Sequence, residues 1–418
     1  MRVIYNCLFY SLTPFILLRL YWRGYKAPDY RLRWRERLGF YSQKSKRNVA
    51  WFHAVSVGEA EAVFPLIKQF MLDQPKCPIL ITTTTPTGSA RVKAVMGNTV
   101  EHVYLPYDLP DVIKRFLNHF KPQKAIIMET EIWPNLFTLT AKQKIPLFII
   151  NARLSERSCR GYQKVSTLIE PALSAITLIA TQTDTDKERF QAISSQTLNV
   201  QTMGNIKFDI QITDALIKQG TSLKTTLFAN RFVWIIASTH KLEEQVFFKL
   251  YSELKQQIPH LLLLIVPRHP ERFDEVAAIA KTENLSLVRR SERAICHKNT
   301  AVYLADTMGE LKMLYAAADI AFVGGSLFKT LGGHNVLEPI AIGIPVMFGG
   351  FMRHFKAIET GILAAKAGLQ CNDRSELINA VLMLYQNPEF KQQLINNADG
   401  FLKQNQGSIQ KIIKQLIR

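Results

Sequence analysis

Three acidic side chains stand where apolar runs give way to polar loops in the first half of the chain. Glu59 follows the run VAWFHA within SVGEAE, whereas Glu129 and Glu131 follow AIIM within METEIWPN. A carboxylate at the end of a buried strand costs free energy unless it is paired or binds a ligand, so each is a candidate for proton transfer. A structural role stays open for Glu59, because Glu in the first turn of a helix capped by Ser56 offsets the helix dipole.

Basic side chains occupy comparable positions at other strand ends. Lys207 in GNIKFD ends the first series of strands and could face an anion, although a surface lysine also explains it. Arg268 and His269 in VPRHPERF lie between prolines that fix the backbone. A guanidinium grips phosphate in a fork, and an imidazole stacks or donates a hydrogen bond. These residues therefore indicate an anion site.

The stretch Gly324–Pro345 reads GGSLFKTLGGHNVLEPIAIGIP and predicts a strand end, a glycine-rich loop and a helix that begins at Asn335. The unpaired amides and positive dipole end of such a helix suit a phosphate, and Glu338 could accept hydrogen bonds from two ribose hydroxyls. Ser238 and Thr239 of ASTHKLEE are expected to cap another helix, and ADTMGEL gives a further loop-to-helix turn. Each turn alone fits an ordinary loop, but several in one half indicate a nucleotide pocket.

Apolar runs alternate with helical segments along the whole chain. The first series is VAWFHA, PILITTT, HVYLPY, AIIMET, PLFIIN, AITLIAT and LNVQTMG, and the second is FVWIIAST, LLLLIVPR, LSLVRR, AVYLAD, IAFVGG and IPVMFG. Strands separated by single helices predict parallel pairing, hence an α/β fold of two Rossmann-like, doubly wound domains that face each other across a cleft. Residues 208–230 show no clear strand and are expected to carry the crossing between the domains. The predicted domains are 23–208 and 209–418, with a last helix able to cross back.

The N-terminal segment predicts membrane attachment. Residues 3–18 are apolar and aromatic but interrupted by Pro14, which is short for a span of ~20 residues. Residues 1–50 hold eleven Lys and Arg against two acids, so half of the chain's net charge of +18 lies there. We expect an uncleaved anchor over residues 1–22, or a helix in the interface, with the basic run on anionic headgroups rather than on nucleic acid. A solvated basic face is the alternative.

The remaining composition describes a large folded protein. The chain has 418 residues, of which 47% are hydrophobic, and this excludes disorder. Its five cysteines (Cys7, Cys77, Cys159, Cys296 and Cys371) are scattered and odd in number, so we expect them to be reduced, as in the cytoplasm. Their spacing does not predict a zinc site.

Taken together, the ordered motifs WFHAVSVGEAE, TTTTPTGS, ETEIWPNL, NARLSERS, GNIKFD, ASTHKLEE, PRHPERF, DTMGEL and GGSLFKTLGGHNVLEP closely resemble the Kdo transferases. That family adds 3-deoxy-D-manno-octulosonic acid (Kdo) to the lipid A precursor of Gram-negative bacteria. The resemblance implies the GT-B architecture, CMP-Kdo as donor, inversion of the anomeric centre, and no metal or cofactor. It also implies an N-terminal anchor that holds the enzyme at the cytoplasmic face of the inner membrane.

The resemblance also implies residue roles. Glu59 corresponds to the general base, and Glu129 and Lys207 to positions that stabilise the transition state. CMP contacts fall on Pro267, Arg268, His269, Met308, Gly309, Glu310, Asn335, Val336, Leu337 and Glu338. The chain departs from the family at IPVMFGGFMRHF, where an Asn often precedes the Phe. Two alternatives stay open: a related enzyme acting on a UDP-sugar, such as an epimerase, and a basic membrane- or polyanion-binding protein without chemistry.

Overall fold

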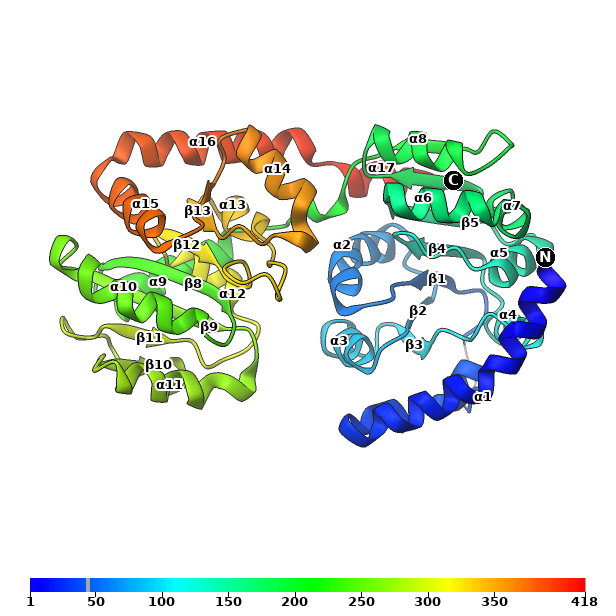
Figure 1. Ribbon diagram of the computed structural model, residues 1–418, viewed down its shortest axis with the longest axis horizontal. Coiled ribbons are helices and arrows are strands. Elements are labelled where there is room, and N and C mark those ends of the chain that lie inside the picture. Colours follow the sequence, from blue (N-terminus) through cyan, green and yellow to red (C-terminus); the bar gives the residue numbers. More distant parts are fainter. Residues whose placement is uncertain (43–45, 418) are drawn as a thin grey trace. The chain divides into compact units, whose positions relative to one another are not determined.

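The computed structural model describes residues 1–42 and 46–417, so residues 43–45 of the basic segment lie outside the described residues. The chain forms two compact units, shown in Figure 1. Unit 1 comprises Met1–Asp209 and Gln406–Arg418, and unit 2 comprises Ile210–Asn405. The closing helix α17 (Ser408–Ile417) therefore belongs to unit 1, where it packs on α2 (Val57–Asp73).

Unit 1 is built on a parallel sheet in the order β3-β2-β1-β4-β5-β6-β7. The strand order reverses beside β1, which is the doubly wound pattern predicted from the alternating sequence. Its strands are β1 (Ala50–His53), β2 (Ile79–Thr83), β3 (Glu101–Tyr104), β4 (Lys124–Met128), β5 (Leu147–Ala152), β6 (Leu178–Thr181) and β7 (Val200–Thr202). Its helices besides α2 and α17 include α3 (Pro86–Met96), α4 (Pro110–Phe120), α5 (Pro134–Lys142), α6 (Glu156–Lys164), α7 (Ser166–Leu173) and α8 (Asp184–Ala192).

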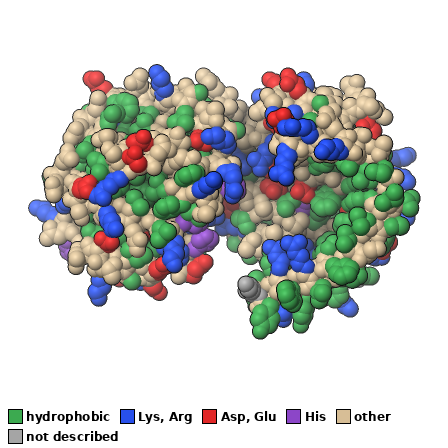
Figure 2. All heavy atoms as spheres, in the orientation of Figure 1, with side chains coloured by type: hydrophobic (Ala, Val, Ile, Leu, Met, Phe, Trp, Pro, Cys, Tyr) green, Lys and Arg blue, Asp and Glu red, His purple; other side chains and the backbone are tan. Residues whose placement is uncertain are grey.

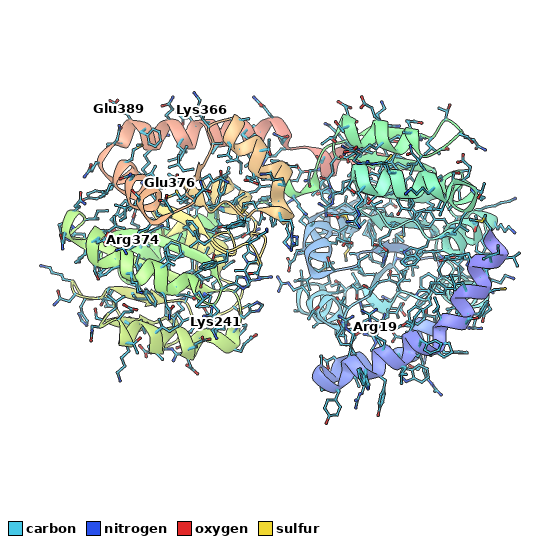
Figure 3. The ribbon with its side chains drawn as sticks, viewed as in Figure 1. Arg19, Lys241, Lys366, Arg374, Glu376 and Glu389 are labelled. Carbon is cyan, nitrogen blue, oxygen red and sulfur yellow. The ribbon has the colours of Figure 1, made fainter. Side chains whose placement is uncertain are left out.

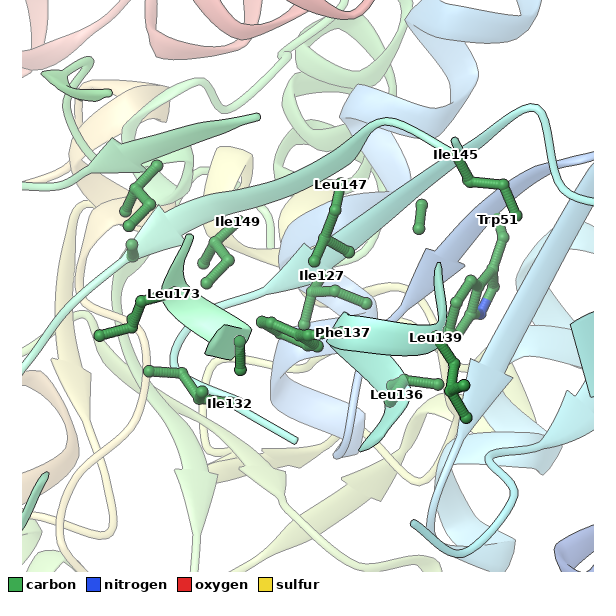
Figure 4. Packing of buried hydrophobic residues seen from close by; sticks show 14 of the residues in the cluster. Trp51, Ile127, Ile132, Leu136, Phe137, Leu139, Ile145, Leu147, Ile149 and Leu173 are labelled. Carbon is green, nitrogen blue, oxygen red and sulfur yellow. The ribbon is translucent and has the colours of Figure 1, made fainter. Parts of the chain in front are cut away.

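Successive side chains of each strand point to opposite sides of the unit 1 sheet, and both faces are buried. Trp51 packs with Ile127 and Phe137 in one core, which Figure 4 shows. Its neighbour Phe52 belongs to the other core, together with Ile412 of α17. The last helix is thus part of the folded core of unit 1.

Unit 2 has a second parallel sheet in the order β10-β11-β9-β8-β12-β13-β14. Its strands are β8 (Phe232–Thr239), β9 (Leu261–Pro267), β10 (Leu287–Arg289), β11 (Val302–Leu304), β12 (Ile320–Val323), β13 (Val346–Phe348) and β14 (Leu369–Gln370). Its helices are α9 (Asp214–Thr226), α10 (Glu243–Gln257), α11 (Phe273–Thr282), α12 (Leu311–Ala316), α13 (Leu337–Ile342), α14 (Lys356–Ala364), α15 (Arg374–Gln386) and α16 (Pro388–Asn405). The prediction of two doubly wound α/β sheets is confirmed. The sequence interpretation missed β14, since two residues are too few to show a period.

The N-terminal helix α1 (Arg2–Lys26) is longer than the predicted apolar segment. Pro14 lies inside it, and Arg19 and Arg23 continue it instead of ending it. Residues Arg2–Tyr25 form a helix long and apolar enough to cross a membrane, and its most apolar window is not buried in the protein. The expectation of a segment too short to span was therefore wrong about its length.

Candidate functional site

The predicted acidic residues of unit 1 gather at one edge of its sheet. Glu59 lies in the first turn of α2, just after β1, and Glu129 directly follows β4. Lys207 lies on the short helix η3 (Ile206–Phe208), after β7. Because β1 and β4 pair in parallel, their carboxyl ends lie side by side. The charges of Glu129 and Glu131 both act on the Glu59 carboxyl, so the three acids form one cluster.

The Glu59 carboxylate is hydrogen-bonded at the start of α2, and the pKa of its carboxyl is raised. Ser56 caps α2, as predicted: its hydroxyl accepts from the Glu59 amide at 3.4 Å. The Glu59 carboxylate accepts in return from the Val55 amide at 2.8 Å and from the Ser56 hydroxyl at 3.2 Å. Burial raises the pKa of the Glu59 carboxyl to about 7, against the opposing bond from Val55 and with the help of the neighbouring acids. A carboxyl that titrates near neutral pH is suited to accept a proton from a substrate.

Glu129 is held between two cations. Its φ of 57° is in the left-handed region, which is uncommon for a residue with a side chain and costs of order 1–3 kcal/mol. Its carboxylate pairs with Arg153 at 3.0 Å and with Lys207 at 3.7 Å. Lys207 therefore faces an anion, and that anion is Glu129. Arg153, which follows β5, was not singled out from the sequence.

Glu131 completes the acidic cluster in a different way. Its carboxylate accepts from the Trp133 indole at 2.9 Å, and burial raises the pKa of this carboxyl. Glu129 also raises it by charge repulsion. The two carboxyls of METEIWPN thus have unlike partners, since Glu129 pairs with cations and Glu131 with a neutral donor.

A buried carboxylate fixes the glycine-rich turn of unit 2. The Glu243 side chain is fully buried and accepts from the amides of Gly325 at 2.8 Å, His240 at 3.0 Å and Leu327 at 3.3 Å. A Cβ at Gly324 would stand 2.9 Å from a Glu243 carboxylate oxygen, so glycine is required there. The sequence interpretation did not identify Glu243, although ASTHKLEE contains it.

The predicted helix caps of ASTHKLEE were wrong. Ser238 and Thr239 end strand β8, and α10 begins behind Leu242, which gives no side-chain cap. Ser238 has a φ of 58°, so the strand bends at its end. The chain uses the buried Glu243 carboxylate to satisfy the amides of this turn.

The helix expected at Asn335 begins two residues later, at Leu337, and contains only six residues. The Asn335 side chain accepts from the Leu337 amide at 3.1 Å, and the Val336 and Leu337 side chains are buried. So short a helix has few aligned peptide dipoles, which weakens the phosphate site predicted from its dipole. Glu338, one residue further, is half-buried beside Tyr315.

The other predicted nucleotide contacts lie at two neighbouring strand ends. Pro267 ends β9, and the Arg268 amide donates to the Thr239 carbonyl at 3.0 Å, while the Arg268 side chain is exposed. The His269 ring is about half-exposed and lies 3.9 Å from Glu271. Arg268 therefore has its guanidinium available at the carboxyl edge of the sheet.

Met308, Gly309 and Glu310 form the turn before α12. Met308 and Gly309 are exposed, whereas the Glu310 carboxylate accepts from Arg290 at 2.8 and 3.1 Å. The bonds from Arg290 hold the pKa of the Glu310 carboxyl below its usual range. A ligand at this turn would therefore meet backbone groups before the Glu310 carboxylate.

Two histidines that the sequence interpretation did not select lie near Arg268. His240 follows β8, and His334 precedes Asn335 in the glycine-rich loop. Their Nε2 atoms are 2.8 Å apart, and the charge of Arg268 acts on both rings. His240 lies in STH and His334 in GGH, both inside motifs identified from the sequence, and these motifs could have indicated the two histidines. Within residues 1–42 and 46–417, no group of three or more His, Cys, Asp or Glu side chains is arranged to hold a metal ion.

The first turns of helix α1 are hydrogen-bonded to the rest of unit 1. Tyr5 donates to the buried Asp108 carboxylate at 2.9 Å, and Arg2 donates to the buried Asn135 side chain at 3.1 Å. Asn135 in turn donates to Asn6 at 2.8 Å. Figure 2 shows the hydrophobic side chains that gather along this helix. Its large exposed apolar residues are Val3, Ile4, Leu8, Tyr10, Leu12, Phe15, Leu18, Tyr21, Trp22 and Tyr25.

Known proteins resemble this chain along nearly its full length. Residues 32–210 match the family described as 3-deoxy-D-manno-octulosonic-acid transferase (kdotransferase). A 3-deoxy-D-manno-octulosonic acid transferase of Haemophilus influenzae is 40% identical over 418 residues, 99% of this chain and 98% of that protein. One from Bordetella pertussis is 31% identical over 99% of this chain and 98% of its own length.

Among solved structures, the UDP-GlcNAc 2-epimerase of Neisseria meningitidis bound to UDP-GlcNAc covers 89% of this chain and 100% of its own, with a TM-score of 0.55. At 15% identity this likeness shows the shared two-domain GT-B type fold. The identification of the family rests on the relatives that match along nearly the full length of the chain. The chain belongs to the 3-deoxy-D-manno-octulosonic acid transferase family, whose members are Kdo transferases of lipopolysaccharide synthesis.

Proposed function

We propose that the protein transfers Kdo from CMP-Kdo to a sugar hydroxyl of the lipid A precursor, with Glu59 as general base. The observation that carries this proposal is the acidic cluster of unit 1, in which Glu59 is half-buried, close to Glu129 and Glu131, and titrates near neutral pH. Glu129 is paired with Arg153 and Lys207, and the Glu131 carboxylate accepts from the Trp133 indole, whereas Glu59 accepts from a backbone amide and a hydroxyl at the start of α2. Of the three acids, Glu59 is the one that we assign as the base, because burial raises its pKa to about 7.

The proposed reaction is one displacement at the anomeric carbon of Kdo. The acceptor hydroxyl oxygen forms the new bond, and its proton passes to Glu59. The bond between the anomeric carbon and the phosphate oxygen breaks, and its electron pair leaves with CMP. A single displacement inverts the anomeric centre, and a positioned base contributes roughly a hundred- to ten-thousand-fold.

Glu129 and Lys207 support the transfer indirectly. The charge of Glu129 raises the pKa of the Glu59 carboxyl, and this makes Glu59 a stronger base. Lys207 has a half-buried ammonium beside Glu129, within reach of a donor carboxylate or phosphate. The ion pair holds both groups in place before substrate arrives.

The donor is proposed to bind at the carboxyl edge of the unit 2 sheet. Arg268 carries an exposed guanidinium for the phosphate, with His269 next to it, and the backbone of Met308 and Gly309 is open. Glu338 is assigned to the ribose hydroxyls. Pro267, Glu310 and the segment 335–337 complete the nucleotide contacts. The cationic side chains meet the charge of the leaving phosphate, so the proposed reaction needs no metal or cofactor.

Helix α1 is proposed to hold the enzyme on the cytoplasmic face of the inner membrane, parallel to the surface. The bonds of Tyr5 and Arg2 to buried groups of unit 1 would be lost if the helix crossed the bilayer. Its exposed apolar side chains would enter the acyl boundary, while Arg19 and Arg23 meet anionic headgroups. Lying flat, α1 would keep the acidic cluster's domain next to a lipid-linked acceptor.

Incubation of the full chain with lipid A precursor and CMP-Kdo tests the proposal. Mass spectrometry should detect a product heavier by one or more Kdo residues, and CMP should inhibit its formation where UDP does not. Preferential inhibition by UDP, or no mass gain with CMP-Kdo, would overturn the proposed donor. Product formation that required an added divalent cation would contradict the metal-independent mechanism.

A further inference from the structure

Two imidazole rings of unit 2 that the proposed mechanism does not use are in direct contact. His240 directly follows β8, and His334 lies in the loop between β12 and α13. The rings are parallel within 5°, with centroids 5.0 Å apart, and their Nε2 atoms are separated by 2.8 Å. The ring of His269 meets that of His240 edge-on at 5.3 Å. Three imidazoles from three segments of the chain thus form one cluster.

The contact between the two Nε2 atoms requires a proton between them. Two facing lone pairs would repel, and two facing N–H groups would clash, so one ring donates and the other accepts. The two rings of the neutral pair are therefore in opposite tautomers. The donor ring has an unprotonated Nδ1 atom outside this bond, which allows the pair to take up one further proton without losing the contact.

The groups that act electrostatically on the pair are two arginines and two further imidazoles. Arg268 and His269 reach it from the end of β9, Arg272 from the 3-10 helix η4 (Pro270–Arg272), and His354 from the 3-10 helix η6 (Arg353–Phe355). Burial first, and the electrostatic effect of these groups second, lower the pKa of His240 to about 4 and that of His334 to about 3. At neutral pH both rings are neutral.

The neighbouring carboxylates are already engaged. Glu243 accepts from three amides, one of which is the backbone amide of His240 itself. The buried Glu244 binds Arg272 through two hydrogen bonds of 2.6 and 3.2 Å, and the exposed Glu271 lies beside His269. These acids thus have other partners, and a bound anion would supply the countercharge that a protonated pair needs.

We propose that His240 and His334 act as one proton-accepting pair of the donor site, and that the phosphate of a bound nucleotide draws a single proton from solvent onto it. This inference rests on the proposed function, because it takes unit 2 as the nucleotide-binding unit. The pair would then carry one extra positive charge only while the anion is bound. Nucleotide binding and protonation favour each other by the same factor, as linkage requires.

The pH dependence has a definite sign. The anion raises the pKa of the pair, so its contribution to affinity is complete below the free-state values of about 3 and 4 and is lost as pH rises through the bound-state value. Between these limits, affinity falls with increasing pH by up to about tenfold per unit, since one proton is bound with each ligand. A purely structural pair, which only holds the glycine-rich loop against β8, would give no such slope.

Calorimetry with the full chain tests the inference, with the methyl phosphodiester of CMP as the probe. This probe keeps a single charge between pH 5 and 7, so protons taken up come from the protein. In two buffers of different ionisation enthalpy, the wild type should show proton uptake, with weaker binding at the higher pH. His240→Gln and His334→Gln should bind with no uptake and a flat pH profile. His260→Gln changes an exposed imidazole elsewhere in unit 2 and should behave as wild type.

The possible outcomes distinguish a failure of this inference from a failure of the proposed donor site. Binding with buffer-independent enthalpy in the wild type, or proton uptake that persists in both glutamine variants, overturns the inference and leaves the donor site standing. Wild-type protein that binds neither this probe nor CMP overturns the proposed donor site and this inference together. Thermal unfolding of the variants, expected to match wild type within a few degrees, separates a loss of the pair from a loss of the fold.

Discussion

The carboxyl edges of the two sheets have the same architecture and opposite chemistry. In unit 1 the acids at the edge are partly accessible, and burial raises the pKa of Glu59 and Glu131. In unit 2 two acids behind the end of β8 are inside: Glu243 and Glu244 are fully buried, and they accept hydrogen bonds from amides and from an arginine. The edge of unit 2 presents Arg268 and imidazoles instead. A carboxylate at a strand end therefore has a proposed role in the reaction in one unit and a structural role in the other, and its burial and its partners distinguish the two.

The largest effect should come from unpairing a buried acid of unit 2. Arg272→Ala leaves Glu244 buried without its cation, which should lower the free energy of unfolding by about 3–5 kcal/mol. Denaturant unfolding followed by fluorescence measures this. Arg374→Ala is the matched control, because its partner Glu253 is about half-exposed and the pair should contribute about 0–1 kcal/mol. Equal losses in the two variants would remove the distinction between structural and exposed acids.

An acid that serves the reaction should instead cost stability. The folded-state pKa of Glu59 is raised to about 7, so ionisation disfavours folding, increasingly from about pH 4.5 up to 7. Glu59→Gln should therefore raise the free energy of unfolding at pH 8 by about 1–3 kcal/mol, and leave it nearly unchanged at pH 4.5. Unfolding curves at the two pH values test this. A variant destabilised equally at both would show that Glu59 is mainly a helix cap.

Charge reversal on α1 tests the proposed attachment of this helix to a membrane. Arg19→Glu should weaken binding to vesicles that contain anionic lipid, by roughly 1 kcal/mol or somewhat more, because an attraction becomes a repulsion. Sedimentation with vesicles at low salt measures the change. Lys366→Glu alters an exposed lysine of unit 2 and serves as the control; both positions are labelled in Figure 3. Equal losses would indicate a general charge effect instead of a surface formed by α1.

The smallest change should come from Glu129→Gln, which removes one of the charges that raise the pKa of Glu59. The acidic limb of the profile of kcat/KM against pH should move to lower pH, because a Glu59 without this repulsion ionises more readily. The fold should be retained, since glutamine keeps the shape of the Glu129 side chain and the Arg153 side chain is exposed. A limb that stays in place would show that Glu129 does not act on the base.

The sequence predicted the fold because periodicity reports burial on both faces of a parallel sheet, as in the runs that became β1 and β4. It also predicted the Ser56 cap, which depends on local geometry alone. The sequence did not predict the features that depend on contacts between distant parts of the chain. Glu243 satisfies the turn that Ser238 and Thr239 were expected to cap, and Asn335 precedes the helix it was expected to begin.

Other features have no local signature at all. Arg153 meets Glu129 from a different strand end, and the imidazoles of His240 and His334 lie 94 positions apart in the sequence. Their pairing depends on sheet order, which places the ends of β8 and β12 side by side. A pattern within one segment cannot report such neighbours, although the motifs that contain them were visible.

Glu59 is proposed to accept the acceptor's proton, and paired substitutions on one helix test this role most directly. Glu59→Gln should reduce turnover of CMP-Kdo and lipid A precursor by about a hundredfold or more, as expected on loss of a positioned base. Glu61→Gln, two residues along α2 in an exposed pair with Arg91, should retain near-normal turnover. A folded Glu59→Gln enzyme that turns over at the wild-type rate would contradict the account.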